Sequence, residues 1–264
     1  MAQSLILNIF AFILGMIVGS FFNVCIHRLP LSESVVWPGS HCPACRKPVR
    51  WYDNIPVVSF ILLDGKCRDC KAIISPRYTV IELVTGVAFL WAWLHYGWTL
   101  TGFVALFLFS ALLVASVVDL EHQIIPDEIS LGGLVLGIAM SGLVPGLHGQ
   151  TVWWRGSLAS VIGVLVGGCL IYGTGVLGTL IFRKDAMGGG DVKLMAMLGA
   201  FLGWKKMVLV YLLAPVLALP MALFFKFAKR VEVIPFGPYL SLAGWVAFLW
   251  GDVLIHWYFR GMLS

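Results

Sequence analysis

The chain has 264 residues, of which 60% are hydrophobic and 12% are charged, and its net charge is +5. Soluble domains are nearer half apolar and a quarter charged, so this composition excludes an ordinary soluble protein with buried helices. The excess of positive charge requires no nucleic-acid partner, because basic residues also collect on the cytoplasmic side of membrane proteins.

Six stretches contain no Asp, Glu, Lys or Arg, and a membrane span needs roughly 20 apolar residues. They are residues 5–24, 83–118, 129–150, 156–182, 207–225 and 233–251. The second stretch is too long for one crossing, and we expect Tyr96-Gly97-Trp98 to divide it. A shorter apolar piece, residues 192–204, is a further segment. The sequence therefore predicts an all-α polytopic membrane protein with about eight transmembrane helices.

No basic segment precedes the first apolar stretch, so we expect no cleavable signal peptide and assign residues 1–26 to the first transmembrane helix. The connection that follows, residues 27–77, carries eight basic residues. The positive-inside rule places this connection in the cytoplasm and the N-terminus outside. The pair Lys205-Lys206 runs against this topology, because it falls on the outer side.

Residues 27–77 also contain four cysteines in two CxxC pairs. Cys42 and Cys45 form the first pair, Cys67 and Cys70 form the second, and 21 residues separate the pairs. Two such turns facing each other make a tetrahedral sulfur site suited to zinc, and a site that uses all four thiolates is structural. The metal would supply stability that so short a loop lacks. Disulfides or redox chemistry are the alternative, which a cytoplasmic location disfavours.

The other two cysteines, Cys25 and Cys169, lie in apolar stretches, where we expect them to be core residues.

Two groups of carboxylates lie at the predicted cytoplasmic ends of membrane segments. They are Asp119, Glu121, Asp127 and Glu128 in the first group, and Asp185 and Asp191 in the second. Charges near hydrocarbon are costly, so their placement needs a reason. We expect tertiary packing to bring Asp119 and Asp191 together, because two facing carboxylates that share a proton form an acid–base pair for peptide hydrolysis.

Glycines 188 to 190 precede Asp191, where they allow close backbone approach and a positive φ, and Asp191 then begins a helix at the positive end of its dipole. Asp127 follows Pro126 and is well placed to cap a helix. Glu121, Glu128 and Asp185 are most simply solvated interface charges. From spacing alone, a purely structural role for Asp119 and Asp191 remains an alternative.

Acidic residues, glycine breaks and apolar spans also describe an ion-coupled transporter. A carrier places its acids near the middle of the membrane in repeated halves, whereas these acids lie at span ends and the chain shows no internal repeat. A zinc-dependent assembly factor without catalysis is the third hypothesis.

Six motifs occur in order along the chain. They are GSFFNVCIHRLP at 19–30, DNIPVVSF at 53–60, SPRYTVIELVTG at 75–86, DLEHQIIPD at 119–127, GGGDVK at 188–193 and IPFGPYLSLAGW at 234–245. Together with the double CxxC, they make nearly the whole chain closely resemble the bacterial type IV prepilin peptidases, bifunctional enzymes of pilus assembly and type II secretion.

The resemblance implies an eight-helix intramembrane aspartyl protease of the GxGD type in the bacterial inner membrane, with a periplasmic N-terminus. Residues 27–77 would form a cytoplasmic zinc-binding domain with four cysteine ligands, and residues 78–264 would form the transmembrane peptidase domain. The family's catalytic aspartates map onto Asp119 and Asp191, with Asp127 as the fallback. The family's cysteine quartet maps onto the two CxxC pairs.

Such enzymes cleave a short basic leader after a glycine from prepilins or pseudopilins, at the cytoplasmic face of the lipid membrane. They then methylate the new N-terminal residue, usually phenylalanine, with S-adenosylmethionine. The chain has no GxGxxG motif for a nucleotide fold, so the methyl-donor site must be built from the cytoplasmic loop and helix ends. Glu82 is a candidate residue there, and a structural pairing with Arg77 or a nearby amide is its alternative.

Overall fold

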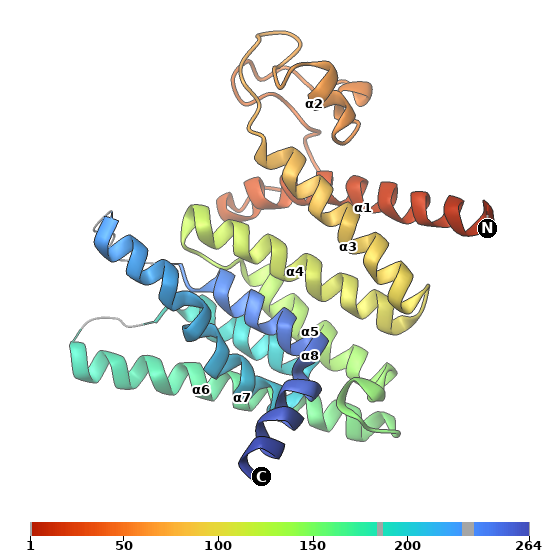
Figure 1. Ribbon diagram of the computed structural model, residues 1–264. Coiled ribbons are helices and arrows are strands. Elements are labelled where there is room, and N and C mark those ends of the chain that lie inside the picture. The colour runs from red at the N-terminus through yellow and green to blue at the C-terminus, as the bar shows by residue number, and fades with distance from the viewer. Residues whose placement is uncertain (1, 184–186, 229–234, 264) are drawn as a thin grey trace. The chain divides into compact units, whose positions relative to one another are not determined.

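The computed structural model describes residues 2–183, 187–228 and 235–263 of the chain. Within those residues it consists of α-helices and three short 3-10 helices, with isolated bridges in place of strands (Figure 1). The chain forms two compact units, Met1–Ser110 and Ala111–Ser264. The prediction of an all-α polytopic membrane protein is confirmed by this architecture.

The first unit is built on two long helices, α1 (Ala2–Arg28) and α3 (Arg77–Tyr96), which pack side by side. Glycines on α1 make the close approach possible: a Cβ atom at Gly15 would lie 2.8 Å from the Cα of Gly86, and one at Gly19 would lie 2.8 Å from the Cα of Glu82. Small residues at helix contacts are the usual means of tight packing in membranes.

Three short elements lie in the connection between α1 and α3. They are η1 (Leu29–Leu31), η2 (Trp51–Asn54) and α2 (Val58–Leu62). Helix α3 ends where Gly97 adopts a positive φ of 59° and donates its N–H to the carbonyl of Trp93. Helix α4 (Leu100–His122) begins three residues later, so the predicted division at residues 96–98 is confirmed.

The second unit contains the end of α4 and the helices that follow it. They are α5 (Asp127–Leu143), η3 (Pro145–His148), α6 (Trp153–Phe182), α7 (Gly189–Ala228) and α8 (Gly237–Leu263). Helices α6 and α7 pack along one another, and α5 and α8 also pack against α7 (Figure 1). Helix α7 therefore occupies the centre of this unit's packing.

Helix α7 reverses direction at Gly203, which has non-helical angles (φ 71°, ψ 170°). Residues before and after the break contact the same point on α6. A Cβ atom at Gly167 would lie 2.5 Å from the carbonyl oxygen of Met195 and 3.2 Å from Cε of Met207. The two halves of α7 thus correspond to two separate apolar segments of the sequence, residues 192–204 and 207–225.

Six helices among the described residues are long and apolar enough to cross a membrane. They are Leu5–Leu31, Arg77–Tyr96, Leu100–His122, Trp153–Phe182, Gly189–Phe224 and Gly237–Tyr258. Helix α5, with 17 residues, is slightly shorter. Counting α5, and counting α7 as two segments, gives the eight segments predicted from the sequence.

Polar groups around the α7 break bind one another. The carbonyl oxygen of Ala200 accepts hydrogen bonds from Ser141 of α5 at 2.9 Å and from Ser160 of α6 at 2.8 Å. The Ser141 hydroxyl also lies 2.9 Å from Nε2 of His148. Backbone carbonyls in apolar surroundings need such partners. The network therefore joins three helices at the point where α7 turns.

The Lys205-Lys206 pair, which runs against the predicted topology, is partly accounted for by an ion pair. Nζ of Lys206 lies 2.8 Å from a carboxylate oxygen of Asp252 on α8, and the Lys206 side chain is only 14% exposed. The carboxylate neutralises a cation that would otherwise be costly beside apolar residues.

Replacement of Gly163 tests the packing of α6 on α7. A Cβ atom at Gly163 would overlap the carbonyl of Gly199 and lie 2.9 Å from the Cα of Gly203, whereas one at Gly168 would meet only Ala196, at 3.8 Å. We expect Gly163→Val to destabilise the protein by about 1–3 kcal/mol through overpacking, measured by unfolding in detergent. Gly168→Val is the matched control, and equal losses for both variants would contradict this packing.

The buried imidazole of His148 gives a pH prediction. Burial lowers the pKa of His148 to about 4, whereas the unfolded value is about 6.5. The native protein therefore binds fewer protons than the unfolded chain between these values, so stability is full above about pH 6.5 and falls as the pH drops towards 4. We expect His148→Gln to flatten the upper part of that fall in thermal unfolding. The exposed control His256→Gln should keep it; the same slope in both variants would refute the assignment.

Candidate catalytic and metal sites

Asp119 lies in the last turn of α4 and is 6% exposed. Its Oδ2 accepts a hydrogen bond of 2.8 Å from the N–H of Gly237, the first residue of α8. The first N–H groups of a helix have no partner within the helix, so this one is available to the carboxylate. A Cβ atom at residue 237 would lie 2.7 Å from Oδ2, so only glycine fits.

Asp191 lies in the first turn of α7 and is half-buried. The preceding glycines let this turn approach the segment between α4 and α5: a Cβ atom at Gly190 would lie 3.1 Å from Cβ of Ile125. The predicted close approach is therefore present. The predicted positive φ is wrong, since none of Gly188 to Gly190 is among the positive-φ residues; α7 already begins at Gly189, and helical angles are negative.

These two contacts bring Asp119 and Asp191 together within the second unit. The carboxylates are close enough for their charges to interact, although they lie 72 positions apart in the sequence. One acid comes from the end of a long helix and the other from the start of another. Two carboxylates near one another disfavour two full negative charges.

Asp127, by contrast, forms an ion pair. Its two carboxylate oxygens lie 2.6 and 2.8 Å from Nζ of Lys193. The prediction that Asp127 caps a helix is wrong: it is the first residue of α5, Pro126 holds the cap position, and no side chain caps this end. Being inside the helix, its side chain turns to the nearby cation. An exposed ion pair contributes at most about 1 kcal/mol.

The remaining acidic residues of the two groups were predicted to be solvated charges at the membrane interface. Glu121 and Glu128 are exposed, as expected for interface charges. Asp185 lies outside the described residues.

The four cysteines of the first unit form one cluster. The Sγ atoms of Cys42, Cys45, Cys67 and Cys70 all lie within 4.8 Å of one another. The Sγ atoms of Cys42 and Cys70 are 3.8 Å apart. A tetrahedral zinc with Zn–S bonds of about 2.3 Å requires S–S separations of about 3.8 Å. The Cys42–Cys70 separation matches this value, so the cluster is suited to a metal of this kind.

The two CxxC turns have the same backbone pattern, displaced by 25 positions. The N–H of Cys42 binds the carbonyl of Lys47 at 3.0 Å, and the N–H of Cys67 binds that of Ala72 at 2.8 Å. The residues that follow the second cysteine of each pair, Arg46 and Lys71, both have positive φ. N–H groups of Cys70 and Asp69 lower the pKa of the Cys67 thiol to about 7, so within the second CxxC pair Cys67 is the thiol that ionises first.

The two remaining cysteines differ from expectation. Cys25 is only half-buried and Cys169 is exposed, so the prediction of a core position is wrong for Cys169. The buried stripe of α6 follows Gly163 and Gly167 towards α7, and Cys169, two residues beyond Gly167, points away from it.

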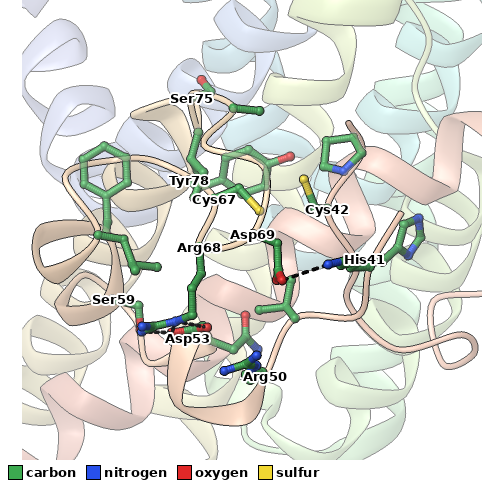
Figure 2. Close-up of a pocket in the computed structure, with 18 of the residues that line it drawn as sticks. His41, Cys42, Arg50, Asp53, Ser59, Cys67, Arg68, Asp69, Ser75 and Tyr78 are labelled. Carbon is green, nitrogen blue, oxygen red and sulfur yellow. Dashed lines mark hydrogen bonds and ion pairs between the residues drawn. The ribbon is translucent and has the colours of Figure 1, made fainter. Parts of the chain in front are cut away.

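A cavity of about 400 Å³ opens in the first unit beside the cysteine cluster. Both CxxC turns, the segment from η2 to α2, Ser20 of α1 and the start of α3 line it. Figure 2 shows Cys42 and Cys67 facing each other, with the Arg68–Asp53 ion pair on one side and Tyr78 on the other. Glu82 also lines the cavity and accepts a 2.8 Å hydrogen bond from the N–H of Val57, so its predicted structural alternative, a nearby amide, is observed.

Fold and site together define a polytopic helical membrane protein with a pair of neighbouring aspartates and a cysteine quartet. Residues 13–96 match the model of the bacterial peptidase A24 N-terminal domain, and residues 106–223 match that of the type IV leader peptidase family. No solved structure matches the chain.

Curated relatives cover almost the whole chain. A prepilin leader peptidase/N-methyltransferase of Stutzerimonas stutzeri is 37% identical over 270 residues, which are 92% of this chain and 90% of the relative. A protein of the same name from Pseudomonas aeruginosa is 34% identical, over 94% of this chain and 92% of its own length. A type 4 prepilin-like proteins leader peptide-processing enzyme of Escherichia coli is 38% identical, over 87% and 89%. The chain belongs to the type IV leader peptidase family.

Proposed function

We propose that this protein cleaves the leader peptide from prepilins or pseudopilins and then methylates the new amino terminus. The names of its relatives support both activities. The observation that carries the peptidase assignment is the juxtaposition of Asp119 and Asp191 at two helix ends. Acids at helix ends also argue against a carrier, which places them near the middle of its spans.

Asp119 and Asp191 act as the catalytic pair in this proposal. The ionised member takes a proton from a water molecule, whose oxygen attacks the scissile carbonyl carbon, while the protonated member donates a hydrogen bond to the carbonyl oxygen. The amide C–N bond then breaks and the leaving amine receives a proton. The hydrogen bond from Gly237 holds Asp119 in place, and the packing of Gly190 on Ile125 places Asp191.

The membrane gives the substrate its position. We place residues 27–77 in the cytoplasm of a bacterial cell and the N-terminus in the periplasm, because the eight basic residues of this connection follow the positive-inside rule. The apolar helix of a prepilin would lie in the bilayer of the inner membrane, with its basic leader in the cytoplasm. The bond to be cleaved then lies at the inner interface, where both aspartates belong in this topology.

The cysteine quartet holds a structural zinc ion in this proposal. The spacing of the four sulfur atoms supports it, and four thiolate ligands leave no coordination position for a reacting water. The metal would fix the two CxxC turns that form part of the cavity wall.

S-adenosylmethionine is the proposed methyl donor. When bound, it supplies a sulfonium methyl group whose S–C bond breaks as the lone pair of the pilin amine forms the new N–C bond, leaving a neutral thioether and one released proton. The cavity in the first unit is large enough for such a molecule and is lined by both polar and apolar side chains.

Replacement of the aspartates tests the peptidase. We expect Asp119→Asn and Asp191→Asn each to reduce cleavage of a purified prepilin at least about a hundredfold without unfolding the protein, because neither amide can exchange the proton. The measurement is the rate of leader removal on a gel, with detergent-purified enzyme.

Asp127→Asn is the matched control, since Asp127 is paired with Lys193 and should be needed far less. Normal cleavage by Asp119→Asn together with loss of cleavage in Asp127→Asn would show that the wrong carboxylate has been assigned.

Metal analysis tests the cysteine site. We expect about one zinc per chain in the purified protein, and we expect Cys42→Ser or Cys67→Ser to lower that content and expose residues 27–77 to protease, because the loop depends on the metal for its fold. Cys169→Ser, which changes a thiol outside the cluster, should retain the zinc. A full zinc content in the Cys42 and Cys67 variants would rule out this site.

A further inference from the structure

We infer that the cavity of the first unit is the methyl-donor site, with Glu82 as the counter-ion of the sulfonium and Arg50 as the partner of the donor's carboxylate. The inference rests on the proposed methyltransferase function, and it adds the residues that recognise the cofactor.

The size and walls of the cavity suit a nucleoside joined to an amino acid. Its volume of about 400 Å³ is within the range of small-molecule sites, roughly 300–1,000 Å³. Phe60, Tyr78 and Ile74 contribute apolar and aromatic surface on which a base can rest. Charged side chains line other parts of the wall, as Figure 2 shows for Arg50, Arg68 and Asp69.

Glu82 provides a buried carboxylate that lines this cavity. The residue is 8% exposed and accepts a hydrogen bond from the N–H of Val57. Among the described residues it makes no ion pair. A buried carboxylate without a counter-charge is costly. A positively charged ligand in the cavity would supply that charge, and a sulfonium is such a cation.

Val57, whose N–H donates a hydrogen bond to Glu82, has a strained backbone. Its φ of 62° and ψ of −48° lie in a region that branched residues rarely adopt. Such strain persists only where the surroundings enforce it, and it gathers at ligand sites. The hydrogen bond to Glu82 is one such restraint, because it binds the Val57 N–H directly. Glu82 therefore shapes this part of the cavity in addition to placing a negative charge there.

Arg50 supplies the complementary cation. Two other basic residues on the wall, Lys47 and Arg68, are each paired with an aspartate. Arg50 instead donates to the uncharged hydroxyl of Tyr52, at 2.7 Å, and makes no ion pair among the described residues. One guanidinium without a carboxylate and one buried carboxylate without a cation match a zwitterionic ligand. A phosphate-bearing nucleotide would instead be repelled by Glu82.

A binding experiment separates the charge of the donor from its shape. S-adenosylhomocysteine has the same nucleoside and amino-acid parts as S-adenosylmethionine but no sulfonium charge. Glu82→Gln keeps an oxygen that can accept the Val57 N–H and removes only the negative charge. In equilibrium dialysis of the purified full chain, we expect this variant to bind S-adenosylmethionine at least about tenfold more weakly and S-adenosylhomocysteine within about threefold of wild type.

Arg50→Gln should behave differently, because both molecules carry the carboxylate that Arg50 would bind. We expect it to weaken both by a similar factor, about tenfold. Glu33→Gln, a matched change at an exposed residue of the same unit, should alter neither. Thermal unfolding and zinc content like those of the wild type show that the Glu82 and Arg50 variants are folded.

The outcomes distinguish the site from the function. If Glu82→Gln weakens both molecules equally or neither, the assignment of the sulfonium partner is wrong while methyl transfer stands. If Glu82→Gln fails to fold, Arg50→Gln decides, and wild-type affinity for both molecules would overturn the site. A wild-type protein that binds neither molecule and transfers no methyl group to a pre-cleaved pilin would refute the proposed methyltransferase function itself.

Discussion

The hydrogen bond from the N–H of Gly237 to Asp119 joins the end of α4 to the start of α8 and fixes a carboxylate in apolar surroundings. Each of the two groups satisfies the hydrogen-bonding requirement of the other. The first N–H of a helix needs an acceptor, and a carboxylate away from water needs a donor. Because a Cβ at residue 237 would lie 2.7 Å from the carboxylate, the bond depends on one glycine. The position of Asp119 against Asp191, and hence the proposed hydrolysis, follows from this contact.

The same constraint recurs where helix α7 departs from regular helix. The carbonyl of Ala200, next to the break at Gly203, is bound by two serines. Hydrocarbon offers no water to satisfy such groups, so irregular backbone is tolerated only beside polar side chains. Isolated polar residues in apolar segments of the sequence therefore include both residues that bind irregular backbone and residues of the candidate sites. The sequence alone does not tell these two kinds of residue apart.

The lengths of the stretches without charged residues predicted the membrane helices, because the thickness of the bilayer fixes how long an apolar stretch must be. Cysteine spacing predicted that the four thiols gather in one cluster that could hold a metal ion, since the geometry of a CxxC turn is local. Contacts between residues that lie far apart in the sequence could not be predicted from such local patterns. Nothing in the spacing of Asp127 indicates that its carboxylate pairs with Lys193, 66 positions away. The capping prediction failed because α5 begins one residue earlier than expected, with Pro126 at the cap position. The juxtaposition of Asp119 and Asp191 was expected from the family resemblance and from the free-energy cost of placing carboxylates near hydrocarbon. The structure adds the contacts of Gly237 and Gly190 beside these residues, which the sequence did not predict.

In the proposed function, the two kinds of chemistry occupy separate compact units. The paired aspartates belong to the second unit, and the cysteine cluster and the cavity belong to the first. Hydrolysis needs carboxylates that share a proton beside lipid, whereas recognition of a charged nucleoside needs opposed single charges in a cavity open to water. These electrostatic requirements conflict within one site, because a cation near the aspartates would favour ionisation of both and remove the shared proton. Division between units lets each set of charges be balanced on its own, so in the proposed function the cleavage of the leader does not depend on the charges of the cavity.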